Sequence, residues 1–419
     1  MIAPAILAMF ASWFAVRWYV GDTVAEYASA AEQDAIELAR LGARWAPADP
    51  FTHWQVATLT EKNFSAENLA EAAREYQLSV ATSPNDYRYW MEYAGGLRAA
   101  GDNSGSEQAL RRAIELAPAY SQPRWYLGNL LIREGKLDEG FEQVRRAALA
   151  DAALQPQLLN LAWQVFAGDV DQIAKVACPT PELRVMLATY LVGRNKIDDA
   201  MRVWNALSRD DKTSSPDLTA ALKQELLKAN QFTNALSVVR DTEPDAPTAE
   251  QIWNGDFELQ IPAEASSPFY WAVASRTQAQ VGIDSDRPHG GERSLRILFN
   301  VPTNLDSIGL WQVIVVNPNT QYHLQYFVRT RDLNSGSTPQ VVIIDMVDTA
   351  TLGMSATAPT GTSDWQKTTI DFKTKASTRA IKLALHRVGC GQAQICPIFG
   401  KIWYDDFSVQ RSGGPGASR

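Results

Sequence analysis

The side chains that could do chemistry are few, and their spacing matches no familiar catalytic motif. The chain has four histidines, and none of them lies in an HExxH sequence: His53, His289, His323 and His386. There is also no GxSxG, no Walker phosphate-binding loop and no GxGxxG after a strand. Asp405 and Asp406 are adjacent, and adjacent residues of a strand point to opposite faces, so this pair cannot flank one bond as acid and base. The sequence therefore predicts a protein that is not an enzyme.

Two of the three cysteines are spaced for a disulfide bond. Cys390 and Cys396 lie in RVGCGQAQICPIFG, in two strand-like runs joined by a short turn that contains glycine. That spacing suits a disulfide that closes a hairpin, which implies an oxidising compartment, and two reduced, half-buried thiols are the alternative. Zinc is not expected, because there is no CxxC and no Cys/His cluster. Cys178 is predicted to be a small buried hydrophobe.

The N-terminal segment predicts attachment to a membrane. IAPAILAMFASWFAV is uncharged and largely apolar, and with RWYV it reaches the roughly 20 residues that span a bilayer. Arg17 can extend to the interface, where Trp13 and Tyr19 are favoured. Because there is no basic n-region and the only A-x-A-like site lies far from the apolar run, an uncleaved anchor over residues 1–21 is favoured over a signal peptide. We therefore expect the rest of the chain at the cell envelope, on the periplasmic or extracellular side.

The charge distribution argues against binding to nucleic acid. The chain has 39 basic and 47 acidic residues, a net charge of −8. Basic and acidic residues balance from Glu250 onward, so the excess of acid lies in the part before it. A nucleic-acid-binding surface needs a basic patch, and neither part of the chain has that composition.

An internal repeat with a period of 34 residues predicts a helical solenoid. Similar residues recur at this period as Pro50, Pro84 and Pro118, as Gly101 and Gly135, and as Ala94 and Gly128. Small residues let two helices of a hairpin approach closely, the later glycine caps the first helix, and proline ends the second. The pattern, clearest in RWYLGNLLIREGKLDEGFEQVRRAAL, resembles the tetratricopeptide repeat. It implies about five or six helical hairpins over residues 50–242, after a capping helix over residues 22–49.

The inner groove of such a solenoid is lined by the first helix of each hairpin. The candidate groove residues are Arg88, Arg98, Trp125, Asn129 and Arg133. Arginine and asparagine at such positions resemble those with which some members of the family clamp a peptide carboxylate, so we predict a groove for a partner protein. A solvated face with no fixed ligand is the alternative.

Beyond an acidic, proline-containing linker over residues 243–251, the period of the apolar residues changes from 3.6 to 2. Strand-like runs such as SLRILF, GLWQVIVV, YHLQYFVRT, PQVVIIDMV and RAIKLALHRV are separated by turn signals such as NPNT and LNSGST. They predict an antiparallel β-sandwich over residues 252–411, followed by a flexible tail over residues 412–419. The expected fold class is therefore a multidomain α + β chain.

The order of segments in this second part resembles that of jelly-roll carbohydrate-binding modules of families 4, 9 and 22. The resemblance covers Ile252 to Gln410 and rests on NGDFE, Trp271, GERSLRI, NPNTQYHLQYFVRT, DWQ and IWYDDFSV. It implies that the first and last strands lie side by side and hold a structural calcium where they meet. The oxygen ligands there would be the carboxylates of Asp256, Glu258, Asp405 and Asp406. The alternative is that the aspartates bond neighbouring backbone without a metal.

The same resemblance implies carbohydrate binding by aromatic rings and planar polar groups. The candidate residues are Trp311, Gln312, Tyr326, Arg329 and His386. Trp365 and Trp403 match framework positions and are expected in the core. Each candidate aromatic has packing as its alternative role.

Three hypotheses for function follow. The first is a non-enzymatic scaffold at the cell envelope, with a solenoid for protein assembly and a jelly-roll head for polysaccharide. The second is a structural subunit that self-assembles into a homo-oligomer or filament through contacts between solenoid and β-domain, with the N-terminal helix packed in a subunit interface. The third is an accessory subunit of a machine that makes or exports polysaccharide.

Overall fold

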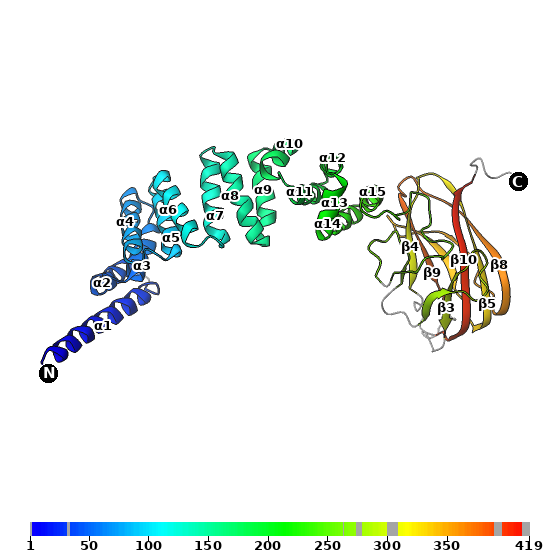
Figure 1. Cartoon of the computed structure of the whole chain (residues 1–419), viewed down its shortest axis with the longest axis horizontal. Helices are drawn as coiled ribbons and strands as arrows, with labels where there is room; N and C mark the ends of the chain where they lie inside the picture. Colours follow the sequence, from blue (N-terminus) through cyan, green and yellow to red (C-terminus); the bar gives the residue numbers. More distant parts are fainter. Residues whose placement is uncertain are drawn as a thin grey trace. The chain divides into compact units, whose positions relative to one another are not determined.

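The chain forms two compact units, one made of helices and one that joins helices to a β-sandwich. The computed structural model describes residues 2–31, 34–262, 264–273, 279–299, 309–388 and 396–412. Contacts group Met1–Pro179 into the first unit and Thr180–Arg419 into the second. The helical N-terminal half and the antiparallel C-terminal β-domain are drawn in Figure 1 and confirm the predicted fold class at that level.

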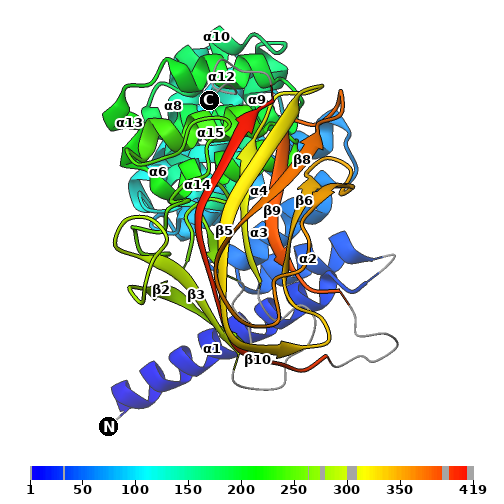
Figure 2. The same ribbon diagram turned by 90° about the vertical axis from the view of Figure 1, so that its right-hand side faces the viewer.

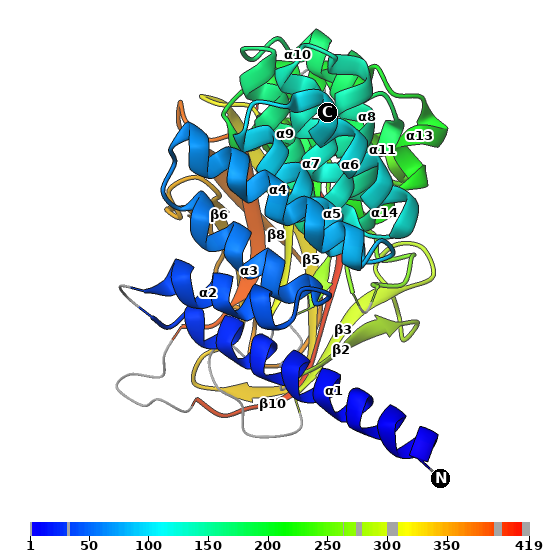
Figure 3. The same cartoon turned by 90° about the vertical axis from the view of Figure 1, so that its left-hand side faces the viewer.

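The first unit is a series of helices, most of which pair as hairpins (Figure 3). Its elements are α1 (Ile2–Ala28), α2 (Ala35–Trp45), α3 (Pro50–Glu61), α4 (Ala66–Thr82), α5 (Tyr87–Ala99), α6 (Asn103–Leu116), α7 (Ser121–Arg133), α8 (Leu137–Ala150), η1 (Ala152–Leu154), α9 (Gln155–Val165), α10 (Val170–Gln172) and η2 (Ile173–Ala177). Helices α7 and α8 begin 34 residues after α5 and α6. The period seen in the sequence is therefore the period of the hairpins.

Short polar side chains start several of these helices. Backbone N–H groups in the first turns of α3, α4, α5 and α6 donate to the side chains of Asp49, Ser65, Asp86 and Asp102. These bonds satisfy donors that have no partner inside the helix. Pro50 is the first residue of α3, where its missing N–H is harmless, so the prediction that this proline ends a helix was wrong. Pro84 and Pro118 lie between hairpins as expected.

Glycine allows the helices of the α7–α8 hairpin to touch. A Cβ atom added to Gly128 would lie 2.5 Å from Cγ2 of Val144 and 2.7 Å from the backbone oxygen of Gly140. Gly101 and Gly135, which follow α5 and α7, have φ values of +90° and +78°. Both features agree with the roles expected for these small residues, because close approach and left-handed backbone both favour glycine.

We predict that Gly128→Ala lowers the free energy of unfolding by about 1–3 kcal/mol, because the new methyl group overpacks the hairpin. Urea unfolding followed by far-UV circular dichroism measures the change. Gly95→Ala is the matched control, because a Cβ atom there meets nothing within 4 Å. In the interior of α5 it should stabilise by about 0.5–1 kcal/mol. Equal effects of the two substitutions would contradict the packing described for Gly128.

A buried histidine carries a positive charge near the start of the hairpin series. Nδ1 of His53 lies 2.7 Å from Oε2 of Glu75, and Nε2 lies 3.1 Å from the backbone oxygen of Pro47. A carboxylate and a carbonyl only accept hydrogen bonds, so both ring nitrogens must donate and the ring is protonated. The hydrogen bond with Glu75 raises the pKa of His53, against the opposing effect of burial.

This pair predicts a loss of stability at alkaline pH. The folded pKa of His53 is raised, so its contribution is present below the unfolded value of about 6.5 and is lost as pH rises through the folded value. Thermal melts of the full chain across this range should show that loss, and Glu75→Gln should flatten it. His323→Gln, which changes an exposed histidine of the second unit, should leave the pH dependence as it is. An unchanged profile in Glu75→Gln would contradict the charged pair.

The second half of α1 packs tightly on α2. A Cβ atom on Gly21 would lie 2.5 Å from Cβ of Ala46 and 2.8 Å from the backbone oxygen of Gly42. Nη2 of Arg17 donates to the backbone oxygen of Arg44 at 2.9 Å. Among the described residues, no helix is long and apolar enough to cross a membrane, so the predicted span has no support from the fold.

The second unit contains five helices among the described residues and two five-stranded sheets. The helices are α11 (Pro181–Gly193), α12 (Ile197–Asn205), α13 (Arg209–Ser214), α14 (Pro216–Lys228) and α15 (Phe232–Thr242). One sheet has the order β1 (Ala272–Val273), β4 (Leu310–Val315), β9 (Ala380–His386), β6 (Gln340–Asp345) and β7 (Thr351–Met354). The other has the order β2 (Gln280–Asp284), β3 (Ser294–Phe299), β10 (Ile398–Arg411), β5 (Gln321–Ser335) and β8 (Gly361–Lys373). Figure 2 shows the long strands β5, β8 and β10 of the second sheet.

The core of the sandwich follows the alternation of the strands. Tyr322, Leu324, Tyr326 and Val328 on β5 all point inward and are buried, as are Ile402 and Tyr404 on β10. All pairs in both sheets are antiparallel, as predicted. The alternating pattern of the sequence therefore fixed which face of each strand packs.

The segment IWNGDFELQ is not the first strand of the sandwich. It forms turns, and its place beside the last strand is held by a hydrogen bond from the backbone N–H of Phe407 to the backbone oxygen of Gly255. The two segments that bracket the domain therefore lie together as expected, although they do not pair as strands. Trp271 is buried against Phe257 and Phe407.

The residues expected to form a linker are bonded to the sandwich. The backbone N–H of Glu250 donates to the backbone oxygen of Val315, and its carboxylate accepts from Asn317, Tyr322 and Arg411. Burial raises the pKa of Glu250, but these hydrogen bonds outweigh it and hold the pKa below its usual value. This end of the segment is consequently fixed to the β-domain.

Candidate groove of the helical unit

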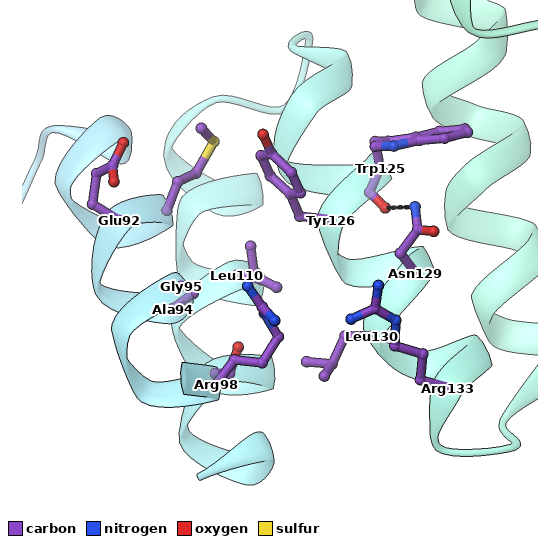
Figure 4. A pocket seen from close by; sticks show the side chains of 12 residues that line it. Glu92, Ala94, Gly95, Arg98, Leu110, Trp125, Tyr126, Asn129, Leu130 and Arg133 are labelled. Carbon is purple, nitrogen blue, oxygen red and sulfur yellow. Dashed lines mark hydrogen bonds between the residues drawn. The ribbon is translucent and has the colours of Figure 1, made fainter. Parts of the chain in front are cut away.

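A hollow of about 440 Å³ lies between neighbouring hairpins of the first unit (Figure 4). Helices α5, α6 and α7 supply its walls. The lining residues are Met91, Glu92, Ala94, Gly95, Arg98, Ser106, Leu110, Trp125, Tyr126, Asn129, Leu130 and Arg133. A cavity of this size can hold a few side chains of a bound peptide.

The repeat itself builds the hollow. Met91 and Trp125 are 34 residues apart, as are Glu92 and Tyr126. Equivalent positions of α5 and α7 therefore face the same space. On each helix the lining residues recur every three or four positions, which places them on one face.

The charged and polar groups of the hollow differ in how they are paired. Arg98 and Arg133 are both exposed, and within the described part of the chain neither guanidinium bonds a carboxylate. Figure 4 shows their side chains extending into the hollow from opposite walls. Nδ2 of Asn129 donates to the backbone oxygen of Trp125 at 2.8 Å, which leaves its carbonyl oxygen available. Burial raises the pKa of Glu92, with a smaller contribution from the charge of Glu61.

The apolar part of the hollow is its floor and one wall. Leu110 and Leu130 are only 4% exposed and close the bottom between the two arginines. Tyr126 is 51% exposed, and Trp125 is half-buried beside it. The hollow thus offers two unpaired cations, a hydrogen-bond acceptor and an apolar surface at close range.

Four of the five predicted groove residues come together here, namely Arg98, Trp125, Asn129 and Arg133. Arg88 does not, because it lies in the first turn of α5 and its Nη2 atom bonds Oδ2 of Asp86 at 2.6 Å. The sequence analysis missed Met91, Glu92 and Tyr126. The 34-residue offset from the predicted positions, combined with helical spacing, is the signal that would have found the tyrosine and its partners.

The four carboxylates expected to bind calcium are largely occupied by backbone groups. Oδ2 of Asp405 accepts from the backbone N–H groups of His289 at 2.9 Å and Gly290 at 3.2 Å. Oε1 of Glu258 accepts from those of Glu292 at 2.7 Å and Arg293 at 3.1 Å. These bonds fix the loop that precedes β3 against the last strand.

The remaining two carboxylates do not complete a metal site. Oδ2 of Asp406 lies 2.6 Å from Nδ1 of His289, and Asp256 is exposed. Among the described residues, no group of three or more His, Cys, Asp or Glu side chains is placed to hold a metal ion. Burial raises the pKa of Asp405 to about 6, a shift that backbone hydrogen bonds from Gly290 and His289 oppose. Calcium prefers six to eight oxygen ligands, so these residues do not fit a calcium site.

We therefore predict that calcium and a chelator give the same melting temperature for the full chain within about 1 °C. The carboxylates already have hydrogen-bond partners, so binding of an ion would have to break those bonds. Differential scanning calorimetry in the presence of calcium or of EDTA measures the difference. A melting temperature that rises by several degrees with calcium, and falls back in Asp406→Asn, would restore the calcium site.

The five residues predicted to bind sugar do not form one site. Gln312 and Tyr326 are buried in the sandwich, where Nε2 of Gln312 donates to the backbone oxygen of Trp253 and the ring of Tyr326 stacks on Phe407. Arg329 is 3% exposed. These three predictions were wrong, because buried side chains offer no surface to a polysaccharide.

The other two candidates remain at the surface. Trp311 on β4 pairs with Ala384 on β9, and Nζ of Lys382 lies 4.8 Å from its ring centre. His386 lies two positions further along β9 and is exposed. Both therefore lie on the outer face of one sheet, although no sugar-sized hollow joins them in the described structure.

Two predicted framework tryptophans have roles other than filling the sandwich core. Trp403 is 1% exposed, but it lies on the outer face of β10 under the guanidinium of Arg329, whose Cζ atom is 4.1 Å from the ring centre. Trp365 is half-buried, and its Nε1 donates to the backbone oxygen of Arg287. Cys178 is buried as predicted. Cys390 lies outside the described residues, so its bond to Cys396 stays a prediction.

No protein-family model matches the chain, and no curated protein matches it. A CBM4 structure is 18% identical at a TM-score of 0.29, and the match covers 38% of this chain and 99% of that one. The CBM22-1 and GH10 modules of Clostridium thermocellum endo-1,4-beta-D-xylanase 10B, complexed with xylohexaose, are 11% identical at a TM-score of 0.28, over 40% of this chain and 29% of that one. The MamA protein is 11% identical at a TM-score of 0.30, over 53% and 96%. At such TM-scores these likenesses carry no argument about function.

Proposed function

We propose that the helical unit is a scaffold that binds a peptide segment of a partner protein in the hollow between α5 and α7. The observation that carries the proposal is the pair of unpaired guanidinium groups, Arg98 and Arg133, that face one apolar-floored hollow. Two like charges directed into one space favour an anion between them, and arginine binds carboxylates through two parallel hydrogen bonds. A peptide carboxylate is the matching group.

The rest of the hollow suits the chain that carries this carboxylate. Leu110 and Leu130 offer a surface for an apolar side chain next to it, and Trp125 and Tyr126 offer a rigid aromatic wall. The free oxygen of Asn129 can accept a backbone N–H of the peptide. Polar groups of this kind fix the direction of a bound chain, whereas the apolar contacts supply most of its affinity.

Binding without catalysis is part of the proposal. Glu92 is the single carboxyl group that lines the hollow, and no histidine or cysteine lines it. The hollow therefore lacks a nucleophile with an adjacent base. A location at the cell envelope is also proposed, and it rests on the apolar N-terminal sequence. Polysaccharide binding is not proposed for the predicted residues, because three of the five are buried.

Fluorescence anisotropy with labelled peptides tests this proposal. A degenerate octapeptide mixture with a free C-terminal carboxylate should bind more tightly than the same mixture with a C-terminal amide. Arg98→Ala and Arg133→Ala should each weaken binding of the acid about tenfold or more, because a charge-assisted hydrogen bond contributes about 1.5–3 kcal/mol. The amide should lose less.

Arg88→Ala is the matched control, because Arg88 lies on α5 but outside the hollow. It should leave the dissociation constant unchanged. The proposal fails if acid and amide bind equally well, or if Arg88→Ala weakens binding as much as Arg98→Ala does. Far-UV circular dichroism of each variant shows whether the helices are retained.

A further inference from the structure

The first half of α1 exposes large apolar side chains to an unusual extent. Nine of them, between Ile6 and Tyr19, are 45–70% exposed. Leu7, Phe10 and Phe14 are among the most accessible, at 70%, 60% and 65%. Figures 1 and 3 show this half of the helix extending away from α2 and from the other helices of its unit. Exposed apolar side chains in such a contiguous group mark a surface that is covered in use.

These side chains surround the helix. Successive residues of an α-helix are rotated by about 100°, so Phe10, Val16, Trp18 and Tyr19 point in four different directions. A groove on a protein covers one stripe of a helix and leaves the other faces in water. A second copy of the chain, packed along one side, has the same limit. An apolar medium that encloses the helix covers all of these side chains at once.

The base of the segment is fixed, which sets how far it projects. The contact of Gly21 with Gly42 and Ala46 leaves no room for a side chain, and Arg17 bonds the end of α2. Residues 6–19 therefore project from an anchored point. Their length is about 20 Å, which exceeds half of the roughly 30 Å hydrocarbon core of a bilayer.

The order of residues along the segment also suits a lipid phase. Ile6, Leu7 and Met9 lie at the far end, whereas Trp18 and Tyr19 lie next to the folded helices. Aromatic side chains with a polar edge prefer the boundary between lipid and water, and aliphatic side chains prefer the interior. Arg17 is placed at the same boundary, with its guanidinium bonded to the protein.

We propose that residues 6–19 of α1 insert into the interior of a lipid bilayer and hold the helical unit at its surface. The partner is the hydrocarbon phase itself and not a charged headgroup, because a single basic residue lies in the segment. This inference is independent of the peptide groove. A failure of either leaves the other standing.

Flotation of the full chain with vesicles of pure phosphatidylcholine tests the insertion. The chain should float with the vesicles, and raising the salt concentration should not release it. Phe10→Asp combined with Phe14→Asp should lower the bound fraction at least tenfold, because a carboxylate is costly in hydrocarbon. Leu149→Asp is the matched control: Leu149 is 73% exposed on α8, and its substitution should leave flotation unchanged.

Quenching by brominated acyl chains gives a second measure. The tryptophan fluorescence of the full chain should fall in such vesicles, and Trp13→Phe should reduce the loss. The inference is overturned if the chain does not float, or if the double variant floats as well as the unchanged chain. Self-association in the absence of lipid, abolished by the same double variant, would assign the segment to a second copy of the chain instead.

Discussion

The close approach of paired helices is the constraint on which the helical unit depends. Gly128 and Gly140 bring α7 and α8 into backbone contact, and the buried Ala94 occupies the corresponding position on α5. Because the partner helix lies directly against this face, the opposite face of α5 and α7 is left for the space between hairpins. The repeat then places equivalent residues of successive hairpins around one hollow. The packing of small residues thus determines where the arginines and aromatics of the groove lie.

The two units treat charge in opposite ways. In the β-domain, carboxylates are used to hold the protein's own loops, as Asp405 holds the residues before β3 and Glu250 holds the start of the domain. Groups satisfied in this way have little left to offer a ligand. In the groove, Arg98 and Arg133 have no such internal partner among the described residues. Unsatisfied charge on an apolar floor is what distinguishes a binding surface from a stabilising network.

The sequence predicted the helical unit better than the sites of the β-domain, for physical reasons. A repeat fixes both the hairpins and the face that each helix presents, so Arg98, Trp125, Asn129 and Arg133 could be placed together. Alternation along β5 already assigns Tyr326 to the face of Leu324 and Val328, so its burial was also predictable. The fate of Asp405 was not, because the backbone groups that occupy it are more than one hundred residues away in the chain. Contacts of that range leave no local pattern.

The most direct test of the groove is a nuclear magnetic resonance titration of the full chain labelled with ¹⁵N at tryptophan. The indole N–H signal of Trp125 should shift and saturate on addition of the octapeptide mixture with free carboxylate, and it should shift much less with the amide form. The signal of Trp90, which lies on α5 and donates to the backbone oxygen of Pro84, should remain in place. An unchanged Trp125 signal at saturating peptide, or equal shifts of both tryptophans, would contradict the assignment of this hollow as the binding site.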